Sequence, residues 1–353
     1  MAGAMKAWVQ TGFGGPEVRR LQQVARPVPA DDEVIVKVIA CALNRLDVLQ
    51  RRQPLVAAFR LPHIAGMDIV GRVAEAGSAA AAALIGTTVV IDPVVTCDAS
   101  DLDHTCDMCR ADLPMYCRNF RTIGSSRDGG LAEYVAVPAR NCIAADSTLT
   151  TLEQLACVPV ASVTAWHGLL GVGRIQSGET VVIPGAGSGL GVAGIQIARD
   201  RGCRVITTVG SAAKLEAART IGADLVIDRS KSDWVVEARR FTDEVGVDFV
   251  WDHVGGPFLQ QAIDGCRIGG RVVLSGSTAG IQSCFKNTSL FQWGKSLLGH
   301  GGYTAAEMRA VVAAYAGGQL RIVIDSRWHF SELPLAEQRL ESDEFFGKLV
   351  IWM

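Results

Sequence analysis

Four cysteines stand close together in one segment of the chain. Cys106, Cys109 and Cys117 follow the spacing C-x2-C-x7-C, and Cys97 precedes them by a short loop. Four thiolates suit a tetrahedral Zn²⁺, and a site closed by four sulfur ligands leaves no open position for a substrate. The cluster therefore predicts a structural zinc. Within the loop, His104 and Asp103 are alternative ligands in place of Cys97.

A second chemical signal is the glycine-rich run PGAGSGLG at 184–191, which follows an apolar strand-like segment and precedes a helical one. Such a turn presents backbone N–H groups and the positive end of a helix to a pyrophosphate. Gly189 and Gly191 allow close backbone approach and tight packing of helix on strand. Ordinary turns also use glycine, but the flanking strands and helices favour dinucleotide binding.

The segment TTVGSAAK at 207–214 lacks the carboxylate that usually binds the free 2′-hydroxyl of NAD. Ser211 can donate a hydrogen bond to a 2′-phosphate, and Lys214 and Arg229 can supply positive charge. This combination favours NADPH over NADH. The alternative is that Lys214 is an ordinary solvated residue on a helix.

The elements that must position these residues form two groups. Early strand-like runs bounded by Gly, Pro or Asp predict an irregular, largely antiparallel, barrel-like unit, with runs at 33–40, 68–77, 87–95 and 131–139. After a helical connector at 151–170, apolar strands alternate with helices, which predicts an α/β fold with a doubly wound parallel sheet; the strands expected are 180–185, 204–210, 224–228, 247–254 and 270–277. We expect one domain at 1–142 with 298–353, and a second at 143–297.

Composition restricts the possible partners. The chain has 353 residues, a net charge of −2 and no long basic run, so neither a nucleic acid nor an anionic membrane is an expected partner. The longest uncharged run, 181–198, contains Pro184 and several glycines, which makes it a poor membrane helix. The first residues do not resemble a secretory signal, so we expect a cytoplasmic protein that acts on a small molecule.

Several motifs together resemble the medium-chain dehydrogenase/reductase superfamily over almost the whole chain. They are MKAW, VKVIACALNRLDVLQRR, LPHIAGMDIVGRV, the cysteine cluster, GAGSGLG, GADLVID and GKLV. The resemblance implies a GroES-like β-rich catalytic domain joined to a Rossmann domain, a C-terminal tail that returns to the catalytic domain, and hydride transfer between the two. It also identifies the cysteine cluster with the structural zinc of the superfamily.

The zinc alcohol dehydrogenases of this superfamily hold a catalytic zinc through two cysteines and a histidine. Their motifs fall here on Asn44, Met67 and Val160, and the acidic neighbour of the histidine falls on Asp68. Zinc is bound by thiolate, imidazole or carboxylate, so Asn, Met and Val do not form such a site. The pattern is similar to the quinone oxidoreductase branch, which works without a catalytic metal.

We therefore expect reduction of a quinone or an α,β-unsaturated carbonyl compound with NADPH. Asn44 and Asp47 are the expected catalytic contacts, although Asp47 can equally cap the helix that follows it. His253 is either a general acid or a residue that packs on the cofactor, and we assign no proton donor. The expected cofactor-binding residues are Thr164, Gly187, Ser188, Gly189, Leu190, Ser211, Lys214, Arg229, His253, Val254, Ser275, Gly276, Ser277 and Lys348.

Two other functions stay open: a zinc-type alcohol dehydrogenase with an unusual metal site, and a non-enzymatic NADPH-binding protein. The expected assembly is a homodimer or homotetramer. The segment SLLGHGG at 296–302 is the candidate edge strand, because exposed sheet edges often pair across a two-fold axis.

Overall fold

The computed structural model describes residues 3–98, 105–145 and 148–353, so Asp103 and His104 lie outside the described residues. The chain forms two compact units: a first unit of Met1–Ala161 with Thr304–Met353, and a second unit of Ser162–Tyr303. The segments 143–161 and 298–303 thus belong to different units from those of the sequence-based division. Among the described residues, no helix is both long and apolar enough to cross a membrane.

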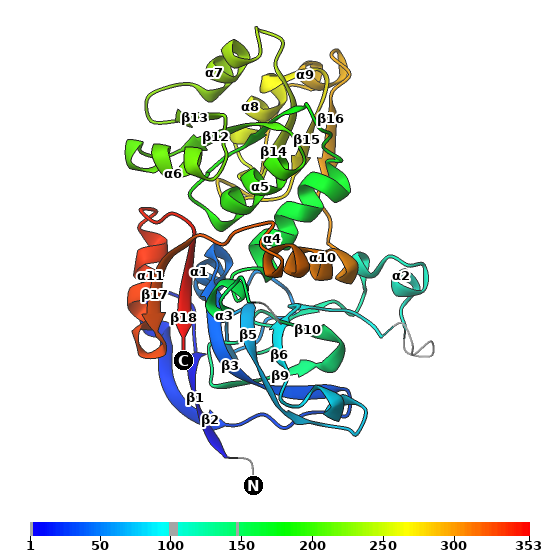
Figure 1. The fold of residues 1–353 in the computed structure, drawn as a ribbon, viewed down its shortest axis with the longest axis vertical. Helices are drawn as coiled ribbons and strands as arrows, with labels where there is room; N and C mark the ends of the chain where they lie inside the picture. Colours follow the sequence, from blue (N-terminus) through cyan, green and yellow to red (C-terminus); the bar gives the residue numbers. More distant parts are fainter. Residues whose placement is uncertain (1–2, 99–104, 146–147) are drawn as a thin grey trace. The chain divides into compact units, whose positions relative to one another are not determined.

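The second unit is built on a six-stranded parallel sheet with the order β13-β12-β11-β14-β15-β16 (Figure 1). Its strands are β11 Thr180–Ile183, β12 Arg204–Val209, β13 Leu225–Asp228, β14 Val247–Asp252, β15 Cys266–Leu274 and β16 Ser296–Gly299. Its helices α5 to α9 are Gly189–Asp200, Leu215–Thr220, Trp234–Phe241, Phe258–Gly265 and Asn287–Phe291. Strand order reverses beside β11, where open α/β sheets bind ligands at the carboxyl ends of their strands. The predicted parallel doubly wound sheet is confirmed.

The first unit is β-rich and mostly antiparallel. Its main sheet has the order β10-β6-β5-β3-β18-β17 with β9 beside β3, and a smaller sheet has the order β2-β1-β4. The strands of the main sheet are β3 Glu33–Leu43, β5 Asp68–Ala76, β6 Thr88–Ile91, β9 Tyr134–Pro138, β10 Cys142–Ala144, β17 Ile324–His329 and β18 Lys348–Trp352. The smaller sheet contains β1 Ala4–Gln10, β2 Arg19–Ala25 and β4 His63–Ile64. The helices of this unit include α1 Arg45–Arg52, α3 Leu152–Leu155, α10 Ala305–Ala316 and α11 Leu333–Glu341.

One expected strand was wrong in its extent. The run 87–95 is divided into β6 and a separate β7 (Val94–Val95), which pairs with β8 (Arg121–Thr122) in another sheet. Pro93 lies at the division, and proline has no N–H to donate to a β-ladder. The chain therefore leaves the main sheet at this point.

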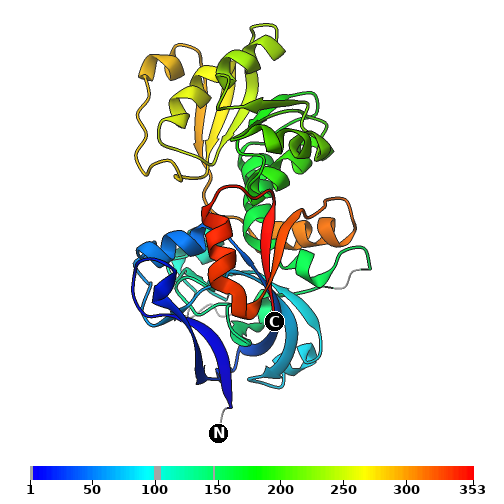
Figure 2. The same cartoon turned by 90° about the vertical axis from the view of Figure 1, so that its left-hand side faces the viewer.

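The C-terminal strand β18 inserts beside β3 in the first unit (Figure 2). In the antiparallel register, Leu349 lies opposite Leu43, while Ala42 lies opposite Asp68 of β5. Because these neighbouring strands are antiparallel, the start of β5, the end of β3 and the start of β18 lie together at one end of the sheet. At this end, the chain continues from β3 into helix α1.

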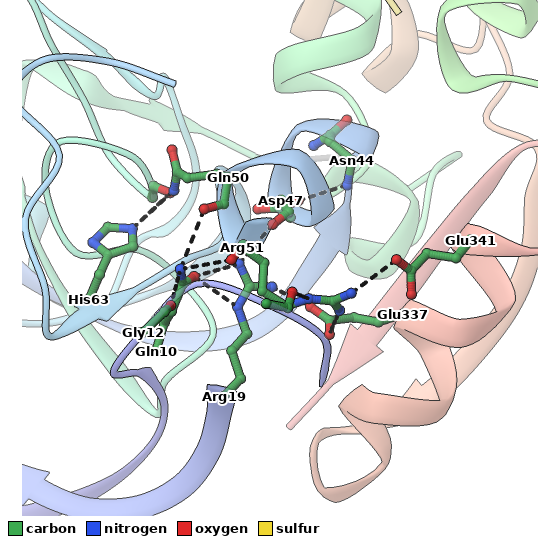
Figure 3. A network of polar contacts seen from close by, with 12 residues as sticks. Gln10, Gly12, Arg19, Asn44, Asp47, Gln50, Arg51, His63, Glu337 and Glu341 are labelled. Atoms are coloured by element: carbon green, nitrogen blue, oxygen red, sulfur yellow. Dashed lines mark hydrogen bonds and ion pairs between the residues drawn. The ribbon is translucent and has the colours of Figure 1, made fainter. Parts of the chain in front are cut away.

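A buried ionic network fixes helix α1 to the rest of the first unit (Figure 3). The carboxylate of Glu337 on α11 pairs with both Arg19 of β2 and Arg51 of α1, and all three side chains are about 1% exposed. Arg51 also contacts Glu341 at 2.9 Å, and Arg19 Nη2 donates to the Asp47 carbonyl at 2.8 Å. Loss of one partner from a buried ion pair leaves an uncompensated charge and is strongly destabilising. The network therefore holds three sequence-distant elements in one arrangement.

Candidate active site and zinc centre

Three polar side chains meet where β5, β3 and β18 come together in the first unit. Lys348 Nζ donates at 2.8 Å to each of Asp68 Oδ2, Asn44 Oδ1 and the Leu43 carbonyl. Asn44 Nδ2 donates to Asp68 Oδ2 at 2.9 Å, and Val160 N donates to Asp68 Oδ1 at 2.7 Å. Positions that the resemblance assigns to a catalytic metal, 44 and 160, are thus joined through one buried carboxylate.

Lys348 does not fit the expected role of a direct cofactor contact. An ammonium group has three hydrogens, and the three contacts of Lys348 Nζ use all of them. Its side chain is 6% exposed. Lys348 instead neutralises Asp68 and holds the amide of Asn44.

Asp47 is the third residue of helix α1, and Asn44 is the N-cap. Asp47 Oδ2 accepts a hydrogen bond from Asn44 N at 2.8 Å, so the carboxylate satisfies a backbone donor at the helix start. It does so from inside the helix, whereas the capping alternative expected Asp47 to precede the helix as its N-cap. Asp47 Oδ1 is buried without a hydrogen-bond partner in the described part of the chain. Burial raises the pKa of Asp47 to about 6, against the opposing effect of the Arg19 guanidinium.

In the second unit, the glycine-rich turn joins β11 to helix α5. Ser188 is the N-cap of α5: its Oγ accepts from Gly191 N and donates to the Gly185 carbonyl, both at 2.9 Å. A Cβ at Gly191 would lie 2.3 Å from the Gly185 oxygen, so this position requires glycine. Gly185 has a φ of 67°, which also favours glycine. The turn is therefore built as a tight strand-to-helix connection that suits a pyrophosphate.

His253, at the end of β14, supports this turn from the neighbouring strand. Its Nε2 lies 2.8 Å from the Pro184 carbonyl, and its ring lies against Trp251 with centroids 5.0 Å apart. Burial lowers the pKa of His253 to about 4. A neutral imidazole that donates to a backbone carbonyl is a poor general acid, so the packing alternative fits better.

The other expected cofactor residues of the second unit lie at the same carboxyl edge of its sheet, with Thr164 as an exception. Ser275 Oγ accepts a hydrogen bond from Trp251 Nε1 at 2.6 Å. The backbone at Gly276 runs close to that of His253, and a Cβ at Gly276 would clash with the His253 carbonyl oxygen at 2.3 Å. Thr164 lies on α4 (Pro159–Trp166), where its carbonyl is 3.0 Å from His300 Nε2.

A cationic group lies at the ends of β12 and β13. Ser211 is exposed and follows β12 after Gly210, and Arg229 is exposed directly after β13. The Arg229 guanidinium comes within 3.4 Å of the position that a Cβ would have at Gly210. It forms no hydrogen bond or ion pair with another side chain in the described part of the chain, so its charge is available to a ligand. Lys214 is half-buried in the following turn.

The four cysteines converge as predicted. The sulfur atoms of Cys97, Cys106, Cys109 and Cys117 all lie within 4.8 Å of one another. The Sγ of Cys117 is 3.5 Å from that of Cys97 and 3.9 Å from that of Cys106. Four sulfurs at Zn–S bonds of about 2.3 Å in a tetrahedron are about 3.8 Å apart, so the residues fit zinc.

The surroundings favour the thiolate at two of the four cysteines, Cys97 and Cys106, whose pKa values are lowered. Backbone N–H groups of Cys109 and Arg118 lower the pKa of Cys106 to about 6, and the Cys106 N–H donates to the Cys97 sulfur at 3.5 Å. Burial instead raises the pKa of Cys109 to about 12, but a coordinating Zn²⁺ deprotonates its thiols outright.

Two buried carboxylates were not among the expected site residues. Asp68 lies at the centre of the cluster formed by Asn44, Asp68 and Lys348, called the Asn44 cluster below. Its position next to Met67, one of the expected metal positions, could have indicated in the sequence that it belongs to the site. Asp252, at the end of β14, accepts from Val254 N and Gly255 N through Oδ1, while its Oδ2 has no partner in the described part of the chain. It braces the loop that carries Val254 at the ligand edge of the sheet.

Comparison with known proteins agrees with this architecture. Residues 30–147 match the alcohol dehydrogenase GroES-like domain, and residues 189–317 match the zinc-binding dehydrogenase model. The acryloyl-coenzyme A reductase of Metallosphaera sedula is 27% identical over 98% of this chain and 99% of its own length. The quinone oxidoreductase of Sus scrofa is 28% identical over 96% of this chain and 95% of its own length. A solved NAD-dependent alcohol dehydrogenase is 31% identical, with a TM-score of 0.88 over 99% of this chain and 100% of that one.

The fold and the matched models together define an oxidoreductase with a GroES-like domain and a Rossmann-type parallel sheet. The chain belongs to the medium-chain dehydrogenase/reductase superfamily, and it is quinone oxidoreductase-like.

We expect purified protein to contain about one zinc per chain, because the four converging thiols form one closed tetrahedral site. Cys109→Ser should release this zinc and lower the melting temperature while NADPH still binds. Elemental analysis and cofactor titration on both proteins measure these effects. Two zincs per chain, or a loss of NADPH affinity as large as the loss of stability, would contradict a purely structural zinc.

The raised pKa of Asp47 predicts a pH effect on stability. Between about pH 4 and 6 the folded chain keeps a proton that the unfolded chain has released, so ionisation of Asp47 destabilises the fold as the pH rises. Relative to Asp47→Asn, the wild type should lose about 2–3 kcal/mol across this range. Denaturant unfolding of both proteins at pH 4.5 and 7 measures the difference. Parallel pH dependence of the two proteins would contradict the assignment.

Proposed function

We propose that this protein reduces a quinone or another α,β-unsaturated carbonyl compound with NADPH and without a catalytic metal. The observation that carries the proposal is the chemistry of Asn44, Met67 and Val160, which offer an amide, a thioether and an apolar side chain where the resemblance places zinc ligands. Two relatives, a quinone oxidoreductase and an acryloyl-coenzyme A reductase, support an acceptor with a conjugated carbonyl group.

Such acceptors suit a site without a Lewis acid. NADPH, when bound, would supply a hydride to the β-carbon of an enone or to the conjugated system of a quinone, and a proton from solvent would complete the two-electron reduction. The negative charge that develops on the acceptor is delocalised into an enolate or a hydroquinone anion. The protein then has to orient the acceptor and donate hydrogen bonds to its oxygen, which a polar residue such as Asn44 can do.

The preference for NADPH is supported by the second unit. Ser211 and the exposed Arg229 flank the backbone at Gly210, and 207–214 contains no carboxylate that would repel a 2′-phosphate. The glycine-rich turn with Ser188 at its helix N-cap suits the pyrophosphate. Together these groups match the two phosphate-bearing parts of NADPH.

A homodimer through β16 is the assembly we favour. Strand β16 pairs with β15 alone among the described strands, so its other edge is open. Large apolar side chains are exposed on the segments preceding it, including Phe291 at 67% and Trp293 at 50%. An open edge beside exposed apolar side chains is a suitable surface for isologous pairing.

Arg229→Ala should weaken NADPH binding by roughly 1–3 kcal/mol and leave NADH binding unchanged, because the guanidinium acts on the 2′-phosphate alone. Lys214→Ala is the parallel variant for the second candidate cation. Fluorescence titration with both cofactors measures the affinities. Equal affinity of the wild type for NADPH and NADH would overturn the cofactor assignment.

The wild type should oxidise NADPH with quinones and enones, and added chelator should not stop the reaction. Simple primary alcohols should turn over slowly. A substrate panel followed at the nicotinamide absorbance, on metal-stripped and zinc-loaded protein, tests both points. Faster turnover of ethanol or benzyl alcohol that chelation abolishes would instead support the alcohol dehydrogenase alternative, which the similarity to a solved alcohol dehydrogenase favours. Tight NADPH binding without turnover of any acceptor would support a binding protein.

A further inference from the structure

The hydrogen bonds around Asn44 determine how its amide is oriented. A lysine ammonium only donates and a carboxylate only accepts. Since Lys348 Nζ lies 2.8 Å from Oδ1 and Asp68 Oδ2 lies 2.9 Å from Nδ2, the oxygen and nitrogen ends of the amide are fixed without ambiguity. The side chain cannot flip without placing NH₂ against the ammonium and oxygen against the carboxylate.

Neither Lys348 nor Asp68 is available to a substrate, because the ammonium has no spare hydrogen and the carboxylate is fully buried. The ammonium uses its three hydrogens on Leu43, Asn44 and Asp68. The Asp68 carboxylate accepts from Val160 N through one oxygen and from Asn44 and Lys348 through the other, and its residue is fully buried. Both groups are therefore internal supports.

Asn44 differs in one respect. Its Nδ2 carries two hydrogens, of which one bonds to Asp68, and the other has no partner in the described part of the chain. The residue is partly exposed, unlike Lys348 and Asp68. The second hydrogen is thus a fixed donor available to a ligand, and it belongs to the N-cap of α1, which the Glu337 network anchors (Figure 3).

Resting on the proposed function, we infer that Asn44 Nδ2 is the hydrogen-bond donor to the carbonyl oxygen of the acceptor, and that Lys348 and Asp68 are positioning residues acting through it. As the acceptor is reduced, its oxygen gains negative charge, which an oriented N–H stabilises. The ammonium at Oδ1 polarises the amide in the direction that strengthens this donor. Asn44 keeps its proton throughout, and the proton of the product comes from solvent.

The central variant is Asn44→Ser. Serine caps a helix as well as asparagine, but its hydroxyl has one hydrogen, which Asp68 will accept. With a quinone and an enone, kcat should fall about 10²–10³-fold, the effect of removing one oxyanion donor, while NADPH affinity stays within about twofold. Gln53→Leu, an exposed amide at the C-cap of the same helix, is the matched control and should leave kcat unchanged. Asn44→Thr is the second variant should the serine variant fold poorly.

Non-additivity tests the positioning role. Lys348→Arg keeps the Asp68 charge paired but cannot reproduce the three contacts of the ammonium, so kcat should fall about tenfold or more. Asn44→Ser/Lys348→Arg should match Asn44→Ser alone within about threefold, because Lys348 acts through Asn44. If Lys348 had only a structural role, the fold-loss in kcat of the double variant would be the product of the losses in the two single variants. Multiplied losses, or an Asn44→Ser enzyme with near-normal kcat, would overturn the inference while the proposed reaction stood.

A binding probe separates this inference from the proposed reaction. p-Nitrophenolate presents a delocalised oxyanion, and its visible absorbance reports binding without turnover. We expect it to bind Asn44→Ser about tenfold or more weakly than wild type and Gln53→Leu. If the wild type reduced no quinone or enone but Asn44→Ser still lost affinity for p-nitrophenolate, Asn44 would be supported as the hydrogen-bond donor and the proposed reaction would be rejected. Equal binding to all three proteins would reject the donor whatever the substrates are.

Discussion

The buried charge of Asp68 is the constraint on which the arrangement of the first unit depends. A carboxylate with no solvent exposure must be hydrogen-bonded and paired to be tolerated. Lys348 supplies the opposite charge, and it can do so only because β18 pairs with β3 and β3 pairs with β5. The last strand of the chain is therefore required beside the third. The same pairing places the amide of Asn44 between the two charges.

A second buried carboxylate has a related effect one helix further on. Glu337 holds Arg51 of α1 and Arg19 of β2, and Arg19 in turn contacts the Asp47 carbonyl. Helix α1 is thus fixed at its N-terminus by the Asn44 cluster and along its length by α11 (Figure 3). Ordered side chains in a preorganised site stabilise developing charge without reorganisation during the reaction. The carboxylates of Asp68 and Glu337 therefore both help to fix the position of helix α1.

Local patterns made much of this molecule predictable from its sequence. The glycine-rich turn is specified by adjacent residues, so Gly191 packs closely against the strand end as expected, and the cysteine spacing alone predicts a convergent cluster. Long-range contacts were less accessible. Asp68 and Lys348 are 280 positions apart, and nothing local distinguishes a buried lysine that pairs with Asp68 from one that contacts a cofactor. The division at Pro93 was also missed, because apolar residues continue on both sides of it.

The neutral balance of the Asn44 cluster also bears on which acceptors suit this site. Lys348 and Asp68 cancel each other, so the cluster offers a reacting oxygen one polarised N–H rather than a full positive charge. One such donor contributes about 3–4 kcal/mol to a transition state. A localised alkoxide, as formed from a simple ketone, needs stronger stabilisation, which zinc enzymes obtain from a Lewis acid. An enolate or hydroquinone anion spreads its charge over several atoms, so for the proposed reaction a single well-held amide would suffice.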